Sequence, residues 1–132
     1  MHLRNFQLRF NQGVEVVAVG HNWDLHNFAT LTAVHYDAAR QVCELEWTAP
    51  SVPNPWGDPS NDFAGCRLRF SGVSRCESEG DPVEPGAVLA EIATVSPDGR
   101  DEPFDIWLSF ESGTLLKLGG EEAELLPLAR AA

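Results

Sequence analysis

Apolar and polar residues alternate along most of the chain, which is the pattern of a β-strand with one buried and one solvated face. The segment Gln41–Trp47 shows it most clearly, because Glu44 and Glu46 separate three apolar side chains that we expect in the core: Cys43, Leu45 and Trp47. The two glutamates should face water on the other side of the strand, where they can meet Arg67 or Arg69 across strands. This pattern predicts an antiparallel sheet that is covered on one side only.

The same alternation predicts further strands at Leu3–Phe10, Val14–Val19, Thr30–Tyr36, Phe63–Val73, Phe104–Phe110 and Thr114–Leu118. Short turn sequences join neighbouring strands, as at Asn11–Gly13 and Asp37–Arg40. Ala87–Val95 also fits helical spacing, but the strong turn signal Ser96–Arg100 behind it favours a strand. The tail holds a last strand or a short helical turn around Glu124–Leu128.

Three segments break the alternation and are expected to be loops. Gly20–Asn27 is polar and irregular, and Glu77–Pro85 is acidic. Thr48–Asp62 contains four prolines, so it can form neither a helix nor a central strand.

These elements predict an all-β fold in one domain that spans residues 1–132. We expect eight or nine short, mainly antiparallel strands in a sandwich or a strongly curled sheet, with at most a short helix. No segment repeats at a fixed period, which argues against propellers and solenoids. No βαβ pattern occurs, which argues against dinucleotide-binding folds.

Charge narrows the range of partners. The chain carries 20 acidic and 9 basic residues, for a net charge of −11, and Lys117 is its only lysine. Such a field repels phosphate backbones and anionic lipid, so we expect neither nucleic-acid nor membrane binding. It serves solubility, or it steers the protein toward a partner with a basic surface.

The three cysteines form neither a Cys-x-x-Cys pair nor an even disulfide set. Cys43 and Cys66 lie among apolar neighbours and are expected in the core, whereas Cys76 is expected to be partly exposed. The first residues have no apolar signal region, and no run approaches the length of a membrane span. These features predict a cytoplasmic protein in a reducing compartment.

No catalytic constellation is apparent. The chain has no Gly-x-Ser-x-Gly elbow, and the neighbours Glu77 and Glu79 should raise rather than lower the pKa of Cys76. The leading expectation is therefore a non-enzymatic protein without a cofactor. The alternative is a small-ligand or metal-binding, β-barrel-like protein that uses the His21–His35 region, with four candidate metal ligands: His21, Asp24, His26 and His35.

The tryptophans give the best functional indication. Trp107 is out of phase with the apolar side chains of its strand, next to Asp105, and should lie on the wet face. Trp23 and Trp56 fall in predicted loops, although Trp56 can instead fold back to close one end of the sheet. If the three tryptophans converge, they form either a second small core or a partner-binding surface ringed by acidic groups, with Asp105 as a further candidate contact.

Two segments carry a family resemblance. Leu68–Val73, followed by Phe104–Leu118 and an acidic end, resembles a group of small β-rich bacterial proteins. The group comprises uncharacterised families and immunity proteins of polymorphic toxin systems. The resemblance implies a β-sheet fold and, for the immunity members, neutralisation of a toxin by surface binding, and it transfers no catalytic residue. We therefore expect an interaction module that binds a basic partner protein, while association with further copies of the chain remains open.

Overall fold

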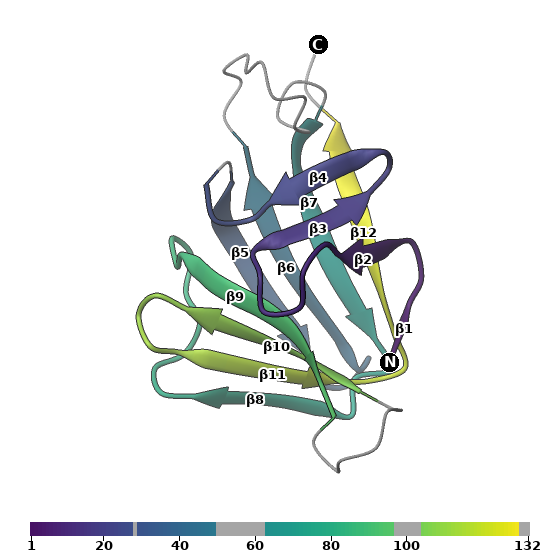
Figure 1. Ribbon diagram of the computed structural model, residues 1–132. Coiled ribbons are helices and arrows are strands. Elements are labelled where there is room, and N and C mark those ends of the chain that lie inside the picture. The colour runs from purple at the N-terminus through teal and green to yellow at the C-terminus, as the bar shows by residue number, and fades with distance from the viewer. Residues whose placement is uncertain (28, 50–62, 97–103, 130–132) are drawn as a thin grey trace.

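The computed structural model describes residues 1–27, 29–49, 63–96 and 104–129. Within these ranges the chain forms twelve strands and no helix (Figure 1). They are β1 (His2–Leu3), β2 (Phe6–Leu8), β3 (Glu15–Ala18), β4 (His21–Asp24), β5 (Thr30–Asp37), β6 (Val42–Thr48), β7 (Phe63–Ser71), β8 (Arg75–Glu79), β9 (Leu89–Val95), β10 (Asp105–Phe110), β11 (Leu115–Gly119) and β12 (Glu122–Ala129). The all-β class is confirmed, with more strands than the eight or nine expected.

The strands form three sheets. A five-stranded sheet has the order β1-β12-β7-β6-β5, a four-stranded sheet β8-β11-β10-β9, and a three-stranded sheet β2-β3-β4. All pairings are antiparallel except that of β1 with β12. The two smaller sheets cover the same face of the five-stranded sheet (Figure 1). They are joined to each other where Ile92 donates its N–H to Gly13 O at 2.7 Å.

One hydrophobic core fills the space between these layers. The five-stranded sheet contributes the expected apolar faces of β6 and β7, with Trp47, Leu68 and Phe70 fully buried. The four-stranded sheet contributes the inward face of β10, with Ile106 and Leu108. Burying each such side chain contributes about 1.5–3 kcal/mol, which makes the period-two pattern the main determinant of the fold.

The close pairing of β6 and β7 depends on Gly65. Its φ of +149° lies in a region that side chains disfavour, and a Cβ there would come within 2.0 Å of Trp47 O. Only glycine fits at this point, because the obstacle is backbone and cannot move aside.

The first predicted strand is divided into two. Leu3–Phe10 does not run straight, because β1 pairs with β12 whereas β2 pairs with β3. Between them the Asn5 side chain replaces backbone pairing: Nδ2 donates to Leu125 O at 2.8 Å, and Leu125 N donates to Oδ1 at 2.7 Å. Phe10, the last residue of the expected strand, lies outside both strands and is exposed.

The prediction of a loop at Gly20–Asn27 is also wrong, since this segment contains β4. β3 and β4 are joined by a tight turn in which Val19 has a φ of 47° and Gly20 a φ of 76°. Hairpin turns with positive φ at both central residues match the twist of the strands, but a β-branched residue is rare there. The turn signal was therefore absent from the sequence.

The pairing of strands decides most of the remaining secondary-structure predictions. Ala87–Val95 contains β9, so the strand interpretation holds, and the tail forms β12 instead of a helical turn. The predicted acidic loop Glu77–Pro85 is partly wrong, because its first three residues belong to β8. The predicted turn at Ser96–Arg100 and most of the proline-rich segment, including Trp56, lie outside the described residues. In the described part of the chain, no helix has the length and apolar character to cross a membrane.

Candidate functional site

Trp107 lies on the outer face of the four-stranded sheet. Its neighbours along β10, Ile106 and Leu108, are buried in the core, whereas Trp107 is partly exposed. This confirms its predicted position out of phase with the apolar face. Its cross-strand partners are Ala93 on β9 and Lys117 on β11.

Lys117 packs on the indole ring of Trp107. Its Nζ lies 4.5 Å from the ring centroid and forms an ion pair with Glu79 on β8. The lysine side chain is only 15% exposed. A cation–π contact at the surface contributes about 0.5–1 kcal/mol, so the ring is held in place and the one lysine of the chain is already paired.

Asp105 anchors the other edge of the indole. Trp107 Nε1 donates a hydrogen bond to Asp105 Oδ2 at 3.3 Å, and Arg75 Nε lies 3.7 Å from the same oxygen. Gly119 makes room for this carboxylate, because a Cβ there would lie 2.6 Å from Asp105 Oδ1. Asp105, a candidate partner-binding residue, is buried. It positions Trp107 instead.

Four acidic residues lie on β8, next to β11, and on the loop that follows β8. Glu77, Glu79, Asp81 and Glu84 are all exposed, on β8 and on the loop after it. Apart from the pair between Glu79 and Lys117, no ion pair joins them to a basic side chain among the residues that the structure describes. We call Trp107, Lys117, Glu77 and Glu79 the Trp107 face, because Lys117 lies across from both Trp107 and Glu77 and forms an ion pair with Glu79. Asp81 and Glu84 lie on the loop beyond it.

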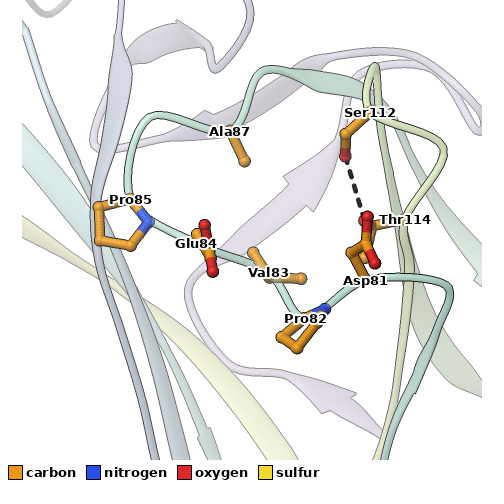
Figure 2. A pocket seen from close by; sticks show the side chains of 8 residues that line it. All are labelled: Asp81, Pro82, Val83, Glu84, Pro85, Ala87, Ser112 and Thr114. Atoms are coloured by element: carbon orange, nitrogen blue, oxygen red, sulfur yellow. Dashed lines mark hydrogen bonds between the residues drawn. The ribbon is translucent and has the colours of Figure 1, made fainter.

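The loop after β8 borders a hollow of about 340 Å³ (Figure 2). Asp81 and Glu84 line it from the loop, and Ser112 and Thr114 line it from the turn between β10 and β11. The two hydroxyls are hydrogen-bonded to each other at 3.1 Å. The hollow is open, mixed in polarity, and continuous in sequence with the acidic end of β8.

The outer face of the five-stranded sheet is also charged, but its charges pair with each other. Arg67 lies 3.2 Å from Glu44 and 2.9 Å from Glu46, which confirms the contact predicted between these strands. At the other edge, Arg4 lies 3.8 Å from Glu122 and 3.7 Å from Glu124. We call this surface the Arg67 face.

Trp23 does not belong to any exposed surface. It lies on β4 and is 4% exposed, and its ring centroid lies 5.5 Å from that of Phe63. Its Nε1 donates to Ala18 O at 3.1 Å, so the polar atom of the ring is also satisfied. Trp23 is thus a core residue of β4 and not the loop residue that the sequence predicts, which leaves it no exposed ring to offer a partner.

The four candidate metal ligands are not brought together. His21 packs against Phe63, with ring centroids 5.9 Å apart. Asp24 accepts hydrogen bonds from the backbone N–H groups of His26 and Asn27 and closes a local turn. His35 lies on β5, in a groove beside Arg67.

His26 Nδ1 lies 2.8 Å from Leu89 O, at hydrogen-bonding distance. Trp23 and Leu25, in the same segment, are buried in the core cluster, whereas a small-ligand site here would need an apolar cavity. In the described ranges, no group of three or more His, Cys, Asp or Glu residues could hold a metal ion. The geometry does not favour the metal-binding alternative.

Comparisons with known proteins add little about function. No protein-family model and no curated protein matches the chain. The fold is similar to the crystal structure of an uncharacterized protein from Neisseria gonorrhoeae, with 14% sequence identity and a TM-score of 0.45. The match covers 78% of this chain and 93% of that one. At this level of similarity it carries no argument about the site.

Proposed function

We propose that the protein is a non-enzymatic interaction module that binds a partner protein with a basic surface through the Trp107 face. The observation that carries the proposal is a fixed, partly exposed tryptophan on a face with two exposed carboxylates, Glu77 and Glu79, that share one lysine. Lys117 forms its ion pair with Glu79, and in the described part of the chain Glu77 forms none. The acidic loop after β8, with Asp81 and Glu84, likewise forms no ion pair among the described residues.

The arrangement suits an anchor residue in an interface. Trp107 is held by Asp105 on one side and by Lys117 on the other, so little side-chain entropy remains to be lost on binding. Tryptophan is enriched among the residues that contribute most to interfaces. The exposed carboxylates of Glu77 and Glu79, and of the acidic loop that follows them, would guide a basic partner and fix its orientation.

The same charges argue against a second copy of the chain as the occupant. Two Trp107 faces brought together would place like charges against each other, in a chain whose net charge is −11. The proposed partner is therefore a different protein.

The resemblance of Leu68–Val73 and Phe104–Leu118 to toxin-immunity proteins is compatible with this proposal. The second segment covers β10 and β11, which carry Trp107 and Lys117. A toxin that is neutralised by surface binding is one partner of the required kind. The free thiols of all three cysteines fit a reducing, cytoplasmic location.

The surroundings of three candidate nucleophiles, Ser112, Thr114 and Cys76, support the non-enzymatic character. The Ser112 and Thr114 hydroxyls pair with each other and not with a base. Burial raises the pKa of the Cys76 thiol, which opposes formation of a reactive thiolate.

The test is capture of a partner from the source organism, followed by binding measurements with purified partner. Glu77→Arg/Glu79→Arg reverses two charges on the Trp107 face, and Trp107→Ala removes the anchor. Glu122→Arg/Glu124→Arg is the matched control, because it makes the same change in net charge on the Arg67 face.

We expect a basic partner that binds wild type and the control with similar affinity and loses affinity for both Trp107-face variants. Binding should also weaken steeply as salt is raised. A partner that is lost in the control and kept by the Trp107-face variants would refute the proposal.

A further inference from the structure

The two edges of the four-stranded sheet differ in how their backbone groups are used. β9 forms one edge and β8 the other. At β9 the N-terminal segment covers the edge: Ile92 N donates to Gly13 O at 2.7 Å, and Gln12 N donates to Ile92 O at 3.1 Å. Thr94 N donates to Asn11 Oδ1 at 2.8 Å. The edge at β9 is therefore closed by the protein itself.

The ladder between β8 and β11 shows which backbone groups of β8 it uses. In an antiparallel ladder, a residue directs its N–H and its C=O to the same side, and the side alternates along the strand. Gly119 O on β11 accepts from Ser74 N at 2.9 Å, so Gly119 faces β8, and so does Lys117 two residues before it. Glu77, the partner of Lys117, therefore directs its backbone groups to β11.

Cys76 and Ser78, on either side of Glu77, direct their backbone groups away from the sheet. Figure 1 shows β8 at the outer edge, with no strand beyond it. Among the residues that the structure describes, none forms a backbone hydrogen bond to these outward groups. The edge at β8 thus offers the N–H and C=O groups of two residues to an added strand.

The side chains beside this open edge are acidic on the outer surface. Glu77 and Glu79 alternate with the two outward residues, belong to the Trp107 face and are exposed. Residues opposite them in an added strand would have Cβ atoms about 4.5–5.5 Å from theirs. Lysine or arginine at these positions would form cross-strand ion pairs.

The same charges disfavour a second copy of β8 as the occupant. A two-fold pairing that uses both Cys76 and Ser78 places Glu77 of one copy directly opposite Glu77 of the other, and like charges at that position are destabilising. A segment with basic side chains has the complementary charge.

We propose that β8 is a docking edge, to which the basic partner adds an extended segment with two lysine or arginine residues that face Glu77 and Glu79. This inference rests on the proposed function and specifies how the partner is held. The residue between the two basic ones lies opposite Ser78, and it pairs with the backbone of β8. The next residue but one lies opposite Cys76, which packs against the core, so small apolar side chains fit on this inner side.

Arg75 limits the length of the basic pattern. It lies two residues before Glu77 on the same outer surface, and its Nε lies 3.7 Å from Asp105 Oδ2. A third basic residue opposite Arg75 would meet a like charge. The segment that fits therefore has two basic residues at alternate positions, followed by a neutral one.

The first test uses hydrogen exchange and a synthetic peptide, Thr-Lys-Val-Lys-Val-Thr, with both ends capped. Paired antiparallel with β8, its lysines lie opposite Glu79 and Glu77, and its valines lie opposite Ser78 and Cys76. In the free protein, the amides of Cys76 and Ser78 should exchange much faster than the amide of Ile92. Saturation with the peptide should slow both at least about tenfold, because each gains an acceptor.

A second peptide separates backbone pairing from charge. N-methyl groups on both valines keep the two lysines but remove the N–H groups that would donate to β8. This peptide should bind at least about tenfold more weakly. The comparison uses the wild-type protein, so it remains valid if a variant does not fold.

The corresponding change in the protein is Ser78→Pro, which removes an outward N–H and leaves the ladder with β11 intact. Tyr36→Pro on β5, an edge strand of the five-stranded sheet, is the matched control. Ala49 N donates to Ala64 O at 2.8 Å, so alternate residues back to Cys43 face β7. Tyr36, the β5 partner of Cys43, therefore directs its N–H outward as well.

Ser78→Pro should weaken binding of the captured partner at least about tenfold, and Tyr36→Pro should bind it as wild type does. Equal binding of the two peptides, unchanged exchange at Cys76 and Ser78, or wild-type affinity in Ser78→Pro would overturn the docking edge. If Glu77→Arg/Glu79→Arg still loses the partner in that last case, the proposed function stands and only the docking edge fails. Slowed exchange with the peptide, together with a partner that keeps its affinity for all Trp107-face variants, would support the docking edge and refute the proposed function.

Discussion

The two charged outer faces of the molecule differ in how their charges are used. On the Arg67 face, one guanidinium joins Glu44 and Glu46 on a neighbouring strand, and Arg4 joins Glu122 and Glu124. On the Trp107 face, Lys117 packs on the indole and is paired with Glu79, while Glu77, across from the same lysine, forms no ion pair among the described residues. Similar composition thus gives one surface whose charges pair internally and one whose charges are free to meet a partner.

The difference follows from strand order. β6 and β7 are adjacent, and their register places Glu44 opposite Arg69 and Glu46 opposite Arg67, so the charges lie across from each other. β8 is an edge strand, and its acidic side chains have a neighbour on one side only. An edge position leaves both its backbone and its charges available.

The largest expected losses of stability come from substitution of two glycines, Gly65 in β7 of the five-stranded sheet and Gly119 in β11 of the four-stranded sheet. Gly65→Ala should cost more than about 3 kcal/mol or abolish folding, because the new Cβ meets the backbone of β6. Gly119→Ala should cost about 1–3 kcal/mol, because the Asp105 side chain can move aside. Urea unfolding of both variants measures the difference. Equal losses would contradict the distinction between a backbone and a side-chain obstacle.

The buried thiols of the five-stranded sheet, beneath the Arg67 face, make the stability of the protein depend on pH. Burial raises the pKa values of Cys43 and Cys66, both in the five-stranded sheet, from 9.0 to about 12. Between these values the unfolded chain releases protons that the folded chain keeps, so stability is complete below pH 9 and falls as the pH rises toward 12. Each thiol should cost about 1.4 kcal/mol of unfolding free energy for each pH unit in this range.

Denaturant unfolding at several pH values in the presence of reductant measures this slope. Cys66→Ala should remove about half of the decline that the two thiols cause, and the ionisation of other groups cancels in the comparison with wild type. An unchanged slope in this variant would mean that Cys66 does not carry the effect.

The smallest effects are expected from the central cations of the two faces. Arg67→Ala and Lys117→Ala should each cost about 1 kcal/mol, because both remove partly exposed interactions. They should differ in fluorescence: Lys117→Ala uncovers the Trp107 ring and increases acrylamide quenching, whereas Arg67→Ala leaves quenching as in wild type. Increased quenching in both variants would show that the two faces are coupled.

The sequence was sufficient for elements whose pattern is local. Leu45 and Trp47 were placed in the core by strict alternation on a strand with clear boundaries, and the structure confirms both. The position of Trp107 on the outer face followed from the same rule. These predictions succeed because the side-chain period of a strand is two wherever the strand is regular.

The errors arise where an unusual residue takes over a role of the backbone. Val19 adopts a positive φ in the hairpin turn before β4, where Asn, Asp or Gly is the usual residue, so the sequence predicts a loop at β4 and Trp23. Asn5 replaces backbone pairing with its side-chain amide and divides one expected strand into two. Neither event has a pattern in the sequence.

The candidate site could be predicted only in part. Trp107 and the acidic residues after β8 were visible in the sequence, but the burial of Asp105 depends on Gly119, on another strand. Which carboxylates form ion pairs depends on strand order. These are tertiary facts that no local pattern carries.

The most direct test of the account is the affinity of the captured partner for two charge-reversed proteins with equal net charge. The account predicts that Glu77→Arg/Glu79→Arg weakens binding at least about tenfold, which corresponds to about 1.4 kcal/mol, while Glu122→Arg/Glu124→Arg stays close to wild type. An equal loss in both would show that only net charge matters. A loss confined to the second would place binding on the Arg67 face and contradict the account.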